Sequence, residues 1–194
     1  MYASSFEKML AFNVARVKQT TDEFWVLSHP AVFTQGVSCD DKPEFNPESI
    51  PVVKSDRGGQ ITYHGPGQLI IYCLLDIKRI GIGPKRLVNV IEQALIDLLG
   101  GFGLHGERRG GAPGVYVADK KIAALGLRIR KGYCYHGLSF NVNADLAPFE
   151  LIDPCGYKGL EVTSLIEQGV NMSMAVVSDK LCAYLSESIY SRTS

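Results

Sequence analysis

Apolar residues recur at helical spacing near the beginning, the middle and the end of the chain. From Phe6 to Val17 they stand at positions 6, 9, 10, 14 and 17, which predicts an amphipathic helix. The clearest pattern runs from Pro84 to Leu99, where the proline suits a first helical turn and Gly100 can supply a left-handed cap. Met174 to Tyr190 predicts a third amphipathic helix.

Shorter apolar runs predict strands. These are Phe24 to Leu27, Gln68 to Ile77, Gly114 to Val117, Ile122 to Ile129 and Tyr133 to Val142. Residues 34–56 are polar and contain three prolines, Pro43 and Pro47 among them, which indicates a long loop of the kind that often serves a function. Strands and helices are mixed without strict alternation, so the pattern favours an α+β fold, and 194 residues fit one domain.

Composition narrows the function classes. With 46% hydrophobic and 21% charged residues, the chain is an ordinary globular protein. Its 20 Lys+Arg balance 20 Asp+Glu, which argues against a nucleic-acid binder that relies on bulk positive charge. No apolar run approaches the roughly 20 residues of a membrane helix, and the first residues do not resemble a signal peptide. Five cysteines without a C-x-x-C pair argue against a disulfide framework or a zinc site and favour a reducing cytosol.

One glycine motif is not expected to bind a dinucleotide, although its spacing matches such a site. Gly101 to Gly106 matches G-x-G-x-x-G, but it follows a predicted helix, whereas a dinucleotide site needs this loop after a strand. The glycines are therefore expected to end the helix and turn the chain.

The densest unusual segment is Arg57-Gly-Gly-Gln-Ile-Thr-Tyr-His-Gly-Pro-Gly-Gln68. Five glycines or prolines in its twelve positions allow the backbone to approach a ligand closely, and its polar side chains can bind one. The alternative is a glycine-rich hairpin with solvated polar residues. The variety of polar types directly before the most apolar strand favours a ligand loop.

A lysine at the start of the strand that follows Gly114 to Val117 is a second candidate. Strand alternation puts Lys120 and Lys121 on opposite faces, so at most one of them reaches a site. A partly buried lysine can stabilise a nearby anion, whereas the alternative is an ordinary solvated edge lysine.

The third candidate is a cysteine. Cys155 lies between Pro154 and Gly156, which present it on a tight turn away from apolar elements. Cys73 and Cys182 lie in core contexts, and Cys39 precedes two aspartates that would raise its pKa. The context favours Cys155 as a nucleophile, with an inert turn cysteine as the alternative.

The chain resembles the lipoyl(octanoyl) transferases at these segments. The matching stretches are Arg57 to Gln68, Ala112 to Val117, Lys121 to Arg130, His136 to Asn143 and Pro154 to Tyr157, with Leu27 to Gly36 as a looser match. They follow the family order. The resemblance can be recognised only from about Phe24 onward. We therefore expect part of the N-terminal region that many members of the family carry to be shortened in this chain. Position 124 is Ala where some members have Ser, which matters little if the backbone makes that contact.

The resemblance implies an acyltransferase with the α+β fold of biotin and lipoate protein ligases, in which residues 1–194 form a single catalytic domain. Its acyl-bearing nucleophile falls on Cys155, and its catalytic lysine, which favours the thiolate, falls on Lys121. The implied substrate contacts are Arg57, Gly58, Gly59, Gln60, Ile61, Thr62, Tyr63, His64, Ala124, Leu125, Gly126, Gly137, Leu138 and Ser139. His64 and His136 lack the spacing of a metal pair, so we expect no metal and no cofactor.

The implied donor is octanoyl-acyl carrier protein. The implied acceptors are a lysine of the lipoyl domains in 2-oxoacid dehydrogenase acyltransferase subunits and the glycine-cleavage H protein. Residues 105–132 hold seven Lys+Arg against two acids, and residues 1–56 hold five against eight. A basic stretch beside the site suits acidic carrier proteins and lipoyl domains, and we expect no nucleic-acid or membrane partner.

Two other functions compete with this one. An ATP-using lipoate or biotin ligase of the same fold would need no nucleophilic cysteine. A binding module for carrier proteins could keep the fold without the chemistry, but Cys155 and Lys121 argue against it.

Overall fold

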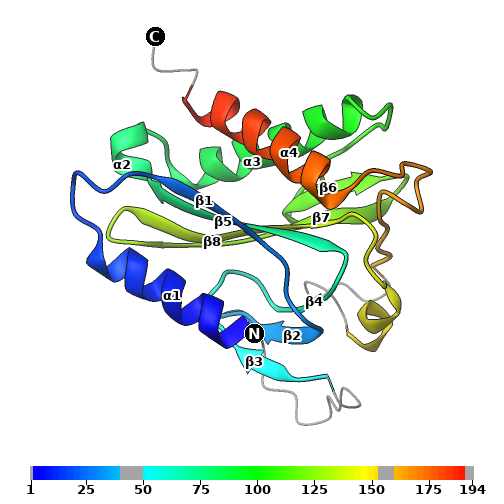
Figure 1. The fold of residues 1–194 in the computed structure, drawn as a ribbon, viewed down its shortest axis with the longest axis horizontal. Helices are drawn as coiled ribbons and strands as arrows, with labels where there is room; N and C mark the ends of the chain where they lie inside the picture. Colours follow the sequence, from blue (N-terminus) through cyan, green and yellow to red (C-terminus); the bar gives the residue numbers. More distant parts are fainter. Residues whose placement is uncertain (1, 40–49, 153–159, 191–194) are drawn as a thin grey trace.

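The computed structural model describes residues 2–39, 50–152 and 160–190. A five-stranded antiparallel sheet forms its centre, in the strand order β1 (Glu23–Leu27), β5 (Gln68–Asp76), β8 (Tyr133–Asn141), β7 (Lys120–Arg130) and β6 (Gly114–Val117). Helices α3 (Pro84–Gly100) and α4 (Met174–Tyr190) cover one face, and α1 (Tyr2–Ala15) lies on the other beside a smaller sheet (Figure 1). This mixture of helices and largely antiparallel strands confirms the α+β class.

Strand β5 is buried along its whole length because both of its faces are covered. Its odd-numbered residues, such as Ile71 and Cys73, join the core beneath α3 and α4. Its even-numbered residues Ile70, Tyr72 and Leu74 join a second core against α1. The continuous apolar run therefore reflects a strand between two layers.

The smaller sheet has the order β3 (Val52–Lys54), β2 (Val32–Gln35), β4 (Ile61–His64). Strand β2 pairs in parallel with β3 and antiparallel with β4. The prediction of a loop over residues 34–56 is therefore wrong at both ends, and residues 40–49 lie outside the described part. A three-residue strand leaves too short a pattern to be read without its pairing partner.

Other boundaries differ by a few residues. Gly100 is still helical in α3, and Gly101 follows it with a φ of −65°, so the predicted left-handed cap at Gly100 is wrong. Gly103 is the first residue there with a left-handed φ, at 78°. The glycine motif thus follows a helix, as predicted. Ile77 belongs to the short helix α2 (Ile77–Ile80), because the Asp76 side chain caps it by accepting from two backbone N–H groups.

One further short helix, η1 (Ala147–Leu151), packs against the smaller sheet. None of the helices in the described ranges is long and apolar enough to cross a membrane.

Candidate active site

A pocket lies under the large sheet, on the side of α1 and the smaller sheet. It is lined by Tyr2, His29, Arg57, Gly58, Gly59, Gln60, Ile61, Thr62, His64, Ile70, Tyr72, Ala124, Leu125, Gly126, His136, Gly137, Leu138 and Ser139. The pocket itself is small, about 60 Å³, but it shares lining residues 58–60, 125 and 126 with a groove of about 660 Å³ along β7. The space available to a ligand therefore continues past the pocket.

The structure brings together all but one of the substrate contacts that the sequence implied. The exception is Tyr63, whose side chain packs with Phe33 and Phe149 in a separate apolar cluster. Its neighbours Thr62 and His64 line the pocket, as alternation along β4 requires.

Paired glycines form part of the pocket wall. Gly126 of β7 lies opposite Gly137 of β8. A Cβ atom at Gly137 would lie 1.8 Å from the carbonyl oxygen of Ile71, so no larger residue fits. At Gly126 a Cβ would lie 3.2 Å from the Arg57 side chain. The two glycines therefore allow the backbone of β5 and the Arg57 side chain to pack closely against the strands that form this wall.

Arg57 braces the glycine-rich loop. Its guanidinium is buried, and it donates to the Thr34 hydroxyl at 3.0 Å and the Thr34 carbonyl at 2.5 Å. It also donates to the carbonyl oxygens of Gly58 at 3.0 Å and Gln60 at 2.6 Å. These bonds to backbone carbonyls set the shape of residues 57–60.

Two buried histidines of the lining are held neutral. Burial lowers the pKa of His29 to about 4 and that of His64 to about 3. The His29 Nε2 lies 2.9 Å from the Tyr72 hydroxyl, and burial raises the pKa of Tyr72. These two histidines therefore contribute polar groups but no charge to the pocket at neutral pH.

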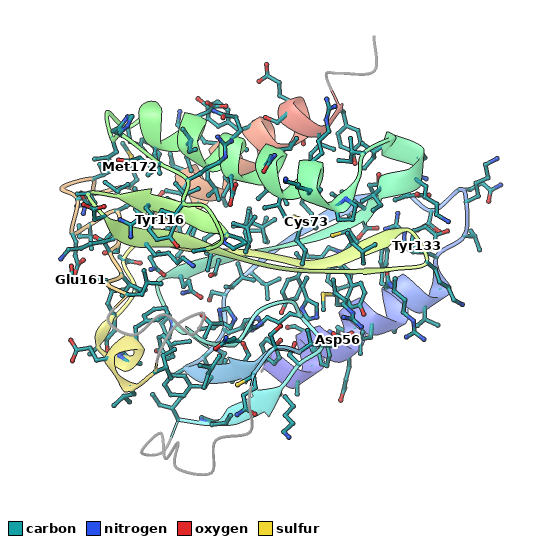
Figure 2. All side chains as sticks on the ribbon, turned by 180° about the vertical axis from the view of Figure 1, so that it is seen from behind. Asp56, Cys73, Tyr116, Tyr133, Glu161 and Met172 are labelled. Carbon is teal, nitrogen blue, oxygen red and sulfur yellow. The ribbon has the colours of Figure 1, made fainter. Side chains whose placement is uncertain are left out.

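A third histidine pairs with a carboxylate. His136 Nε2 lies 2.7 Å from Asp56 Oδ1, and the Tyr135 hydroxyl donates to the other Asp56 oxygen. Burial raises the pKa of Asp56, but the hydrogen bonds from His136 and Tyr135 outweigh it, so the pKa lies below its usual value. Figure 2 shows Asp56 on the small-sheet side of the large sheet and Cys73 on the helix side.

Lys121 is buried at the start of β7, with 4% of its surface exposed. Its Nζ donates to the Pro113 carbonyl at 3.1 Å and lies 5.4 Å from the centroid of the Tyr116 ring. The adjacent Lys120 is only partly buried, with 45% of its side chain exposed, and it pairs with Glu161 at 2.9 Å. Only one of the two lysines is thus enclosed by protein, as alternation predicted.

Cys155 lies outside the described residues, so the structure does not test its prediction as the nucleophile. The described residues on both sides of it are anchored. Ile152 packs with Phe33 and Tyr63. After the gap, the Lys121 N–H donates to the Glu161 carbonyl at 2.9 Å, and the Thr163 N–H donates to the Lys121 carbonyl at 3.0 Å. Residues 161–163 therefore run beside Lys121, and Glu161 and Tyr116 lie at the same end of the sheet (Figure 2).

Other thiols lie in apolar surroundings. Burial raises the pKa of Cys73 well above its usual value and that of Cys134 to about 12. Burial also raises the pKa of Cys182. These three cysteines are poor nucleophiles, which agrees with the core contexts predicted for Cys73 and Cys182.

The sequence reasoning missed several lining residues, namely Tyr2, His29, Ile70 and Tyr72. His136 stands in a motif of the resemblance, which predicts a hydrogen-bonding or substrate-positioning histidine, and the structure places it in the lining. His29 also stands in such a motif, so a signal for it was present. Tyr2, by contrast, comes from α1, and only the packing of this helix against the sheet brings it to the pocket.

Comparisons with known proteins agree with this site. Residues 2–186 match the family described as lipoyl protein ligase A/B catalytic domain, so the relationship begins well before Phe24. An octanoyltransferase of Azoarcus sp. (strain BH72) is 52% identical over 187 residues, which cover 95% of this chain and 82% of the relative. One of Chromobacterium violaceum is 50% identical over 184 residues, which cover 95% and 89%.

Solved structures confirm the fold. A lipoate-protein ligase A bound with ATP matches with a TM-score of 0.77 at 16% identity, over 97% of this chain and 81% of that one. A biotin protein ligase from Aquifex aeolicus matches with a TM-score of 0.53 at 22% identity, over 63% and 53%. The family match and the identity to curated relatives carry the assignment: the chain belongs to the lipoyl protein ligase A/B catalytic domain family, and within it to the octanoyltransferases, which are acyltransferases.

Proposed function

We propose that this protein transfers an octanoyl or lipoyl group from acyl carrier protein, through a Cys155 thioester, to a specific lysine of lipoyl domains. This would be the first step of endogenous protein lipoylation, carried out by residues 1–194 as one catalytic domain. The observation that carries the proposal is the burial of Lys121 beside residues 161–163, a few positions after Cys155, in a chain about half identical to octanoyltransferases.

Chain connectivity supports a Cys155–Lys121 pair. Glu161, whose carbonyl accepts from the Lys121 N–H, stands only six positions after Cys155. Even a fully extended chain of this length spans no more than about 20 Å. A cationic lysine near a thiol stabilises the thiolate, which is the attacking form.

The first half of the reaction loads the enzyme. The Cys155 thiolate attacks the carbonyl carbon of the donor thioester, a new C–S bond forms, and the donor C–S bond breaks. The carrier protein leaves as a thiolate and takes the proton of the Lys121 ammonium, which leaves Lys121 as a neutral amine. Because one thioester replaces another, this step needs no ATP.

The second half transfers the group to the acceptor. The lysine amine attacks the Cys155 thioester, an amide bond forms, and Cys155 leaves as a thiolate. Lys121, in its neutral form, takes the proton that the amine loses. The glycine-lined pocket and the groove along β7 would hold the acyl chain, since each buried methylene contributes about 0.8 kcal/mol.

The proposed partners are acidic proteins. Lys121 lies within residues 105–132, where Lys+Arg outnumber Asp+Glu by seven to two. Such a stretch attracts acidic carrier proteins and acidic lipoyl domains, and it raises the rate of encounter. We place the reaction in the cytoplasm, because Cys73, Cys134 and Cys182 are free thiols of the kind that a reducing compartment maintains.

An intact-mass measurement tests the proposal. Enzyme mixed with octanoyl-acyl carrier protein should become heavier by one octanoyl group, and peptide mapping should place that group on Cys155. Loading of Cys39 or Cys134 instead, or no loading at all, would refute the assignment. Product formation from octanoate only when ATP is supplied would identify the ligase instead.

A further inference from the structure

A series of buried side-chain hydrogen bonds connects the pocket to the segment paired with Lys121. His64 Nδ1 lies 2.7 Å from Gln68 Oε1. Gln68 Nε2 donates to Asn141 Oδ1 at 2.8 Å, and Asn141 Nδ2 donates to the Thr163 carbonyl at 2.9 Å. All four residues are buried. The series therefore runs from the pocket lining into the backbone beside Lys121 without exposure to water.

The Thr163 carbonyl, at one end of this series, determines which group donates and which accepts in each hydrogen bond. A backbone carbonyl can only accept a hydrogen bond, so Asn141 must turn its NH₂ group to Thr163 and its oxygen to Gln68. Gln68 must then turn its own NH₂ group to Asn141, and the Tyr63 carbonyl at 3.5 Å is a second acceptor on that side. The Gln68 oxygen consequently faces His64. The hydrogen of the neutral imidazole must lie on Nδ1.

This tautomer leaves Nε2 as a hydrogen-bond acceptor. Burial lowers the pKa of His64 to about 3, so the ring remains neutral at neutral pH. The Tyr2 ring stacks over it at 6.2 Å, and His64 is part of the pocket lining. Within the described ranges, no residue donates to Nε2. The lone pair is available to a molecule in the pocket.

We propose that Gln68 and Asn141 are positioning residues that hold His64 in its Nδ1–H form, so that Nε2 accepts a hydrogen bond from the attacking amine of the acceptor lysine. The amine is the partner that fits, because an acyl chain and a thioester carry no N–H or O–H donor. A ring this weakly basic orients the amine without taking its proton. The choice of occupant rests on the proposed function, but the tautomer does not.

Nitrogen NMR of protein labelled with ¹⁵N in histidine tests the tautomer directly. The chain has four histidines, and a His64→Gln variant identifies the His64 signals. At neutral pH we expect a protonated Nδ1 and an unprotonated Nε2. A protonated Nε2 would overturn the proposal. The tautomer is measured in the unmodified protein, and the variant serves only to identify which signals belong to His64.

Single-turnover kinetics test the positioning role. Asn141→Leu removes the shorter of the two hydrogen bonds that orient the Gln68 amide and leaves only the Tyr63 carbonyl at 3.5 Å, so the amide can turn more readily and the His64 tautomers should mix. Transfer from octanoyl-enzyme to a lipoyl domain should slow by roughly tenfold, the value of one neutral hydrogen bond, while loading from octanoyl-acyl carrier protein keeps its rate. Asn143→Leu is the matched control, because Asn143 stands two residues further on and is exposed. Equal slowing of both half-reactions would show a merely structural role.

A Gln68→Glu variant supplies a pH signature. Its carboxylate still accepts from Nδ1–H, so the tautomer should persist, but the added negative charge should raise the pKa of His64. Transfer to the amine should then fall as pH drops through this raised pKa, since an imidazolium Nε2–H donates and no longer accepts. A transfer rate with the pH profile of the unmodified enzyme would contradict the proposal. If the unmodified enzyme never loads octanoyl, the proposed function fails, whereas the NMR result still decides the tautomer.

Discussion

Lys120 and Lys121 are adjacent in β7, yet their ammonium groups have opposite surroundings. Lys121 is 4% exposed, and its Nζ donates to the Pro113 carbonyl at 3.1 Å. The Lys120 side chain is 45% exposed and pairs with Glu161 at 2.9 Å. Replacing either lysine by alanine removes one positive charge from the same strand. The two positions therefore form a matched pair for testing whether Lys121 stabilises the proposed Cys155 thiolate.

Lys121→Ala should raise the pKa of Cys155 and slow its alkylation by iodoacetamide at neutral pH. A rise of one pKa unit would mean about a tenfold lower thiolate fraction, and the rate should recover as the pH increases. Lys120→Ala should leave the profile almost unchanged. Peptide mapping separates Cys155 from the other thiols. Identical profiles for the unmodified protein and Lys121→Ala would exclude the charge effect.

Lys121→Arg should separate the two half-reactions. A guanidinium retains the positive charge but cannot lose a proton in the physiological range, so it can support the thiolate but cannot act as a base. The variant should therefore load octanoyl at Cys155 and pass it poorly to a lipoyl domain. Rapid transfer by this variant would show that another group takes the proton.

The sequence predicted those helices and strands that are marked by hydrophobic spacing or by turn residues close to them in the chain. The amphipathic spacing of Met174–Tyr190 and the turn after Gly114–Val117 gave the observed bounds of α4 and β6. Strand β3 could not be predicted, because three residues carry no period of their own and pair with β2 only in the folded chain. Whether such a segment forms a strand depends on pairing with residues far away in the sequence, and a local pattern does not encode that pairing.

The sequence likewise predicted some residues of the candidate site and not others. Residues 57–64 were visible because glycine and polar residues are concentrated there. Tyr2 and Ile70 reach the pocket only through the packing of α1 and the alternation of β5, and nothing in their local sequence marks them as ligand contacts. The strongest sequence candidate, Cys155, lies outside the described residues, so its role remains a prediction.

Glu92 should control the position of the loop that contains Pro113, whose carbonyl oxygen accepts a hydrogen bond from Lys121. Its carboxylate is buried, accepts from the Gly114 N–H at 2.9 Å and pairs with Arg108 at 3.2 Å. Glu92→Leu leaves the Gly114 N–H without a partner and should lower the free energy of unfolding by about 1–3 kcal/mol. Glu92→Gln keeps the acceptor and should cost less than about 1 kcal/mol, because Arg108 is partly exposed. Urea unfolding measures both, and equal losses would contradict this account.

Gly137→Ala should destabilise the sheet beneath the pocket. Its Cβ would lie 1.8 Å from the Ile71 carbonyl oxygen, so β5 and β8 would have to separate. We expect a loss of about 1–3 kcal/mol or more in the free energy of unfolding. Gly100→Ala is the control, because nothing lies within 4 Å of its Cβ and Gly100 is helical. That control should stabilise the protein by up to about 1 kcal/mol, and a Gly137→Ala protein of unchanged stability would be inconsistent with the close contact.

Acid should destabilise the protein through its buried neutral histidines, and His29 offers a clear test. Burial lowers the pKa of His29 to about 4 in the folded chain, whereas an unfolded histidine has its usual pKa of about 6.5. Between these values the unfolded chain binds a proton that the folded chain does not, so stability falls as pH decreases from about 6.5 to 4. In His29→Gln the slope of the unfolding free energy against pH should decrease by about one proton in this range. His105→Gln, at an exposed position, is the matched control. Urea unfolding at several pH values measures the slope, and an unchanged slope in His29→Gln would show that folding does not lower the pKa of His29.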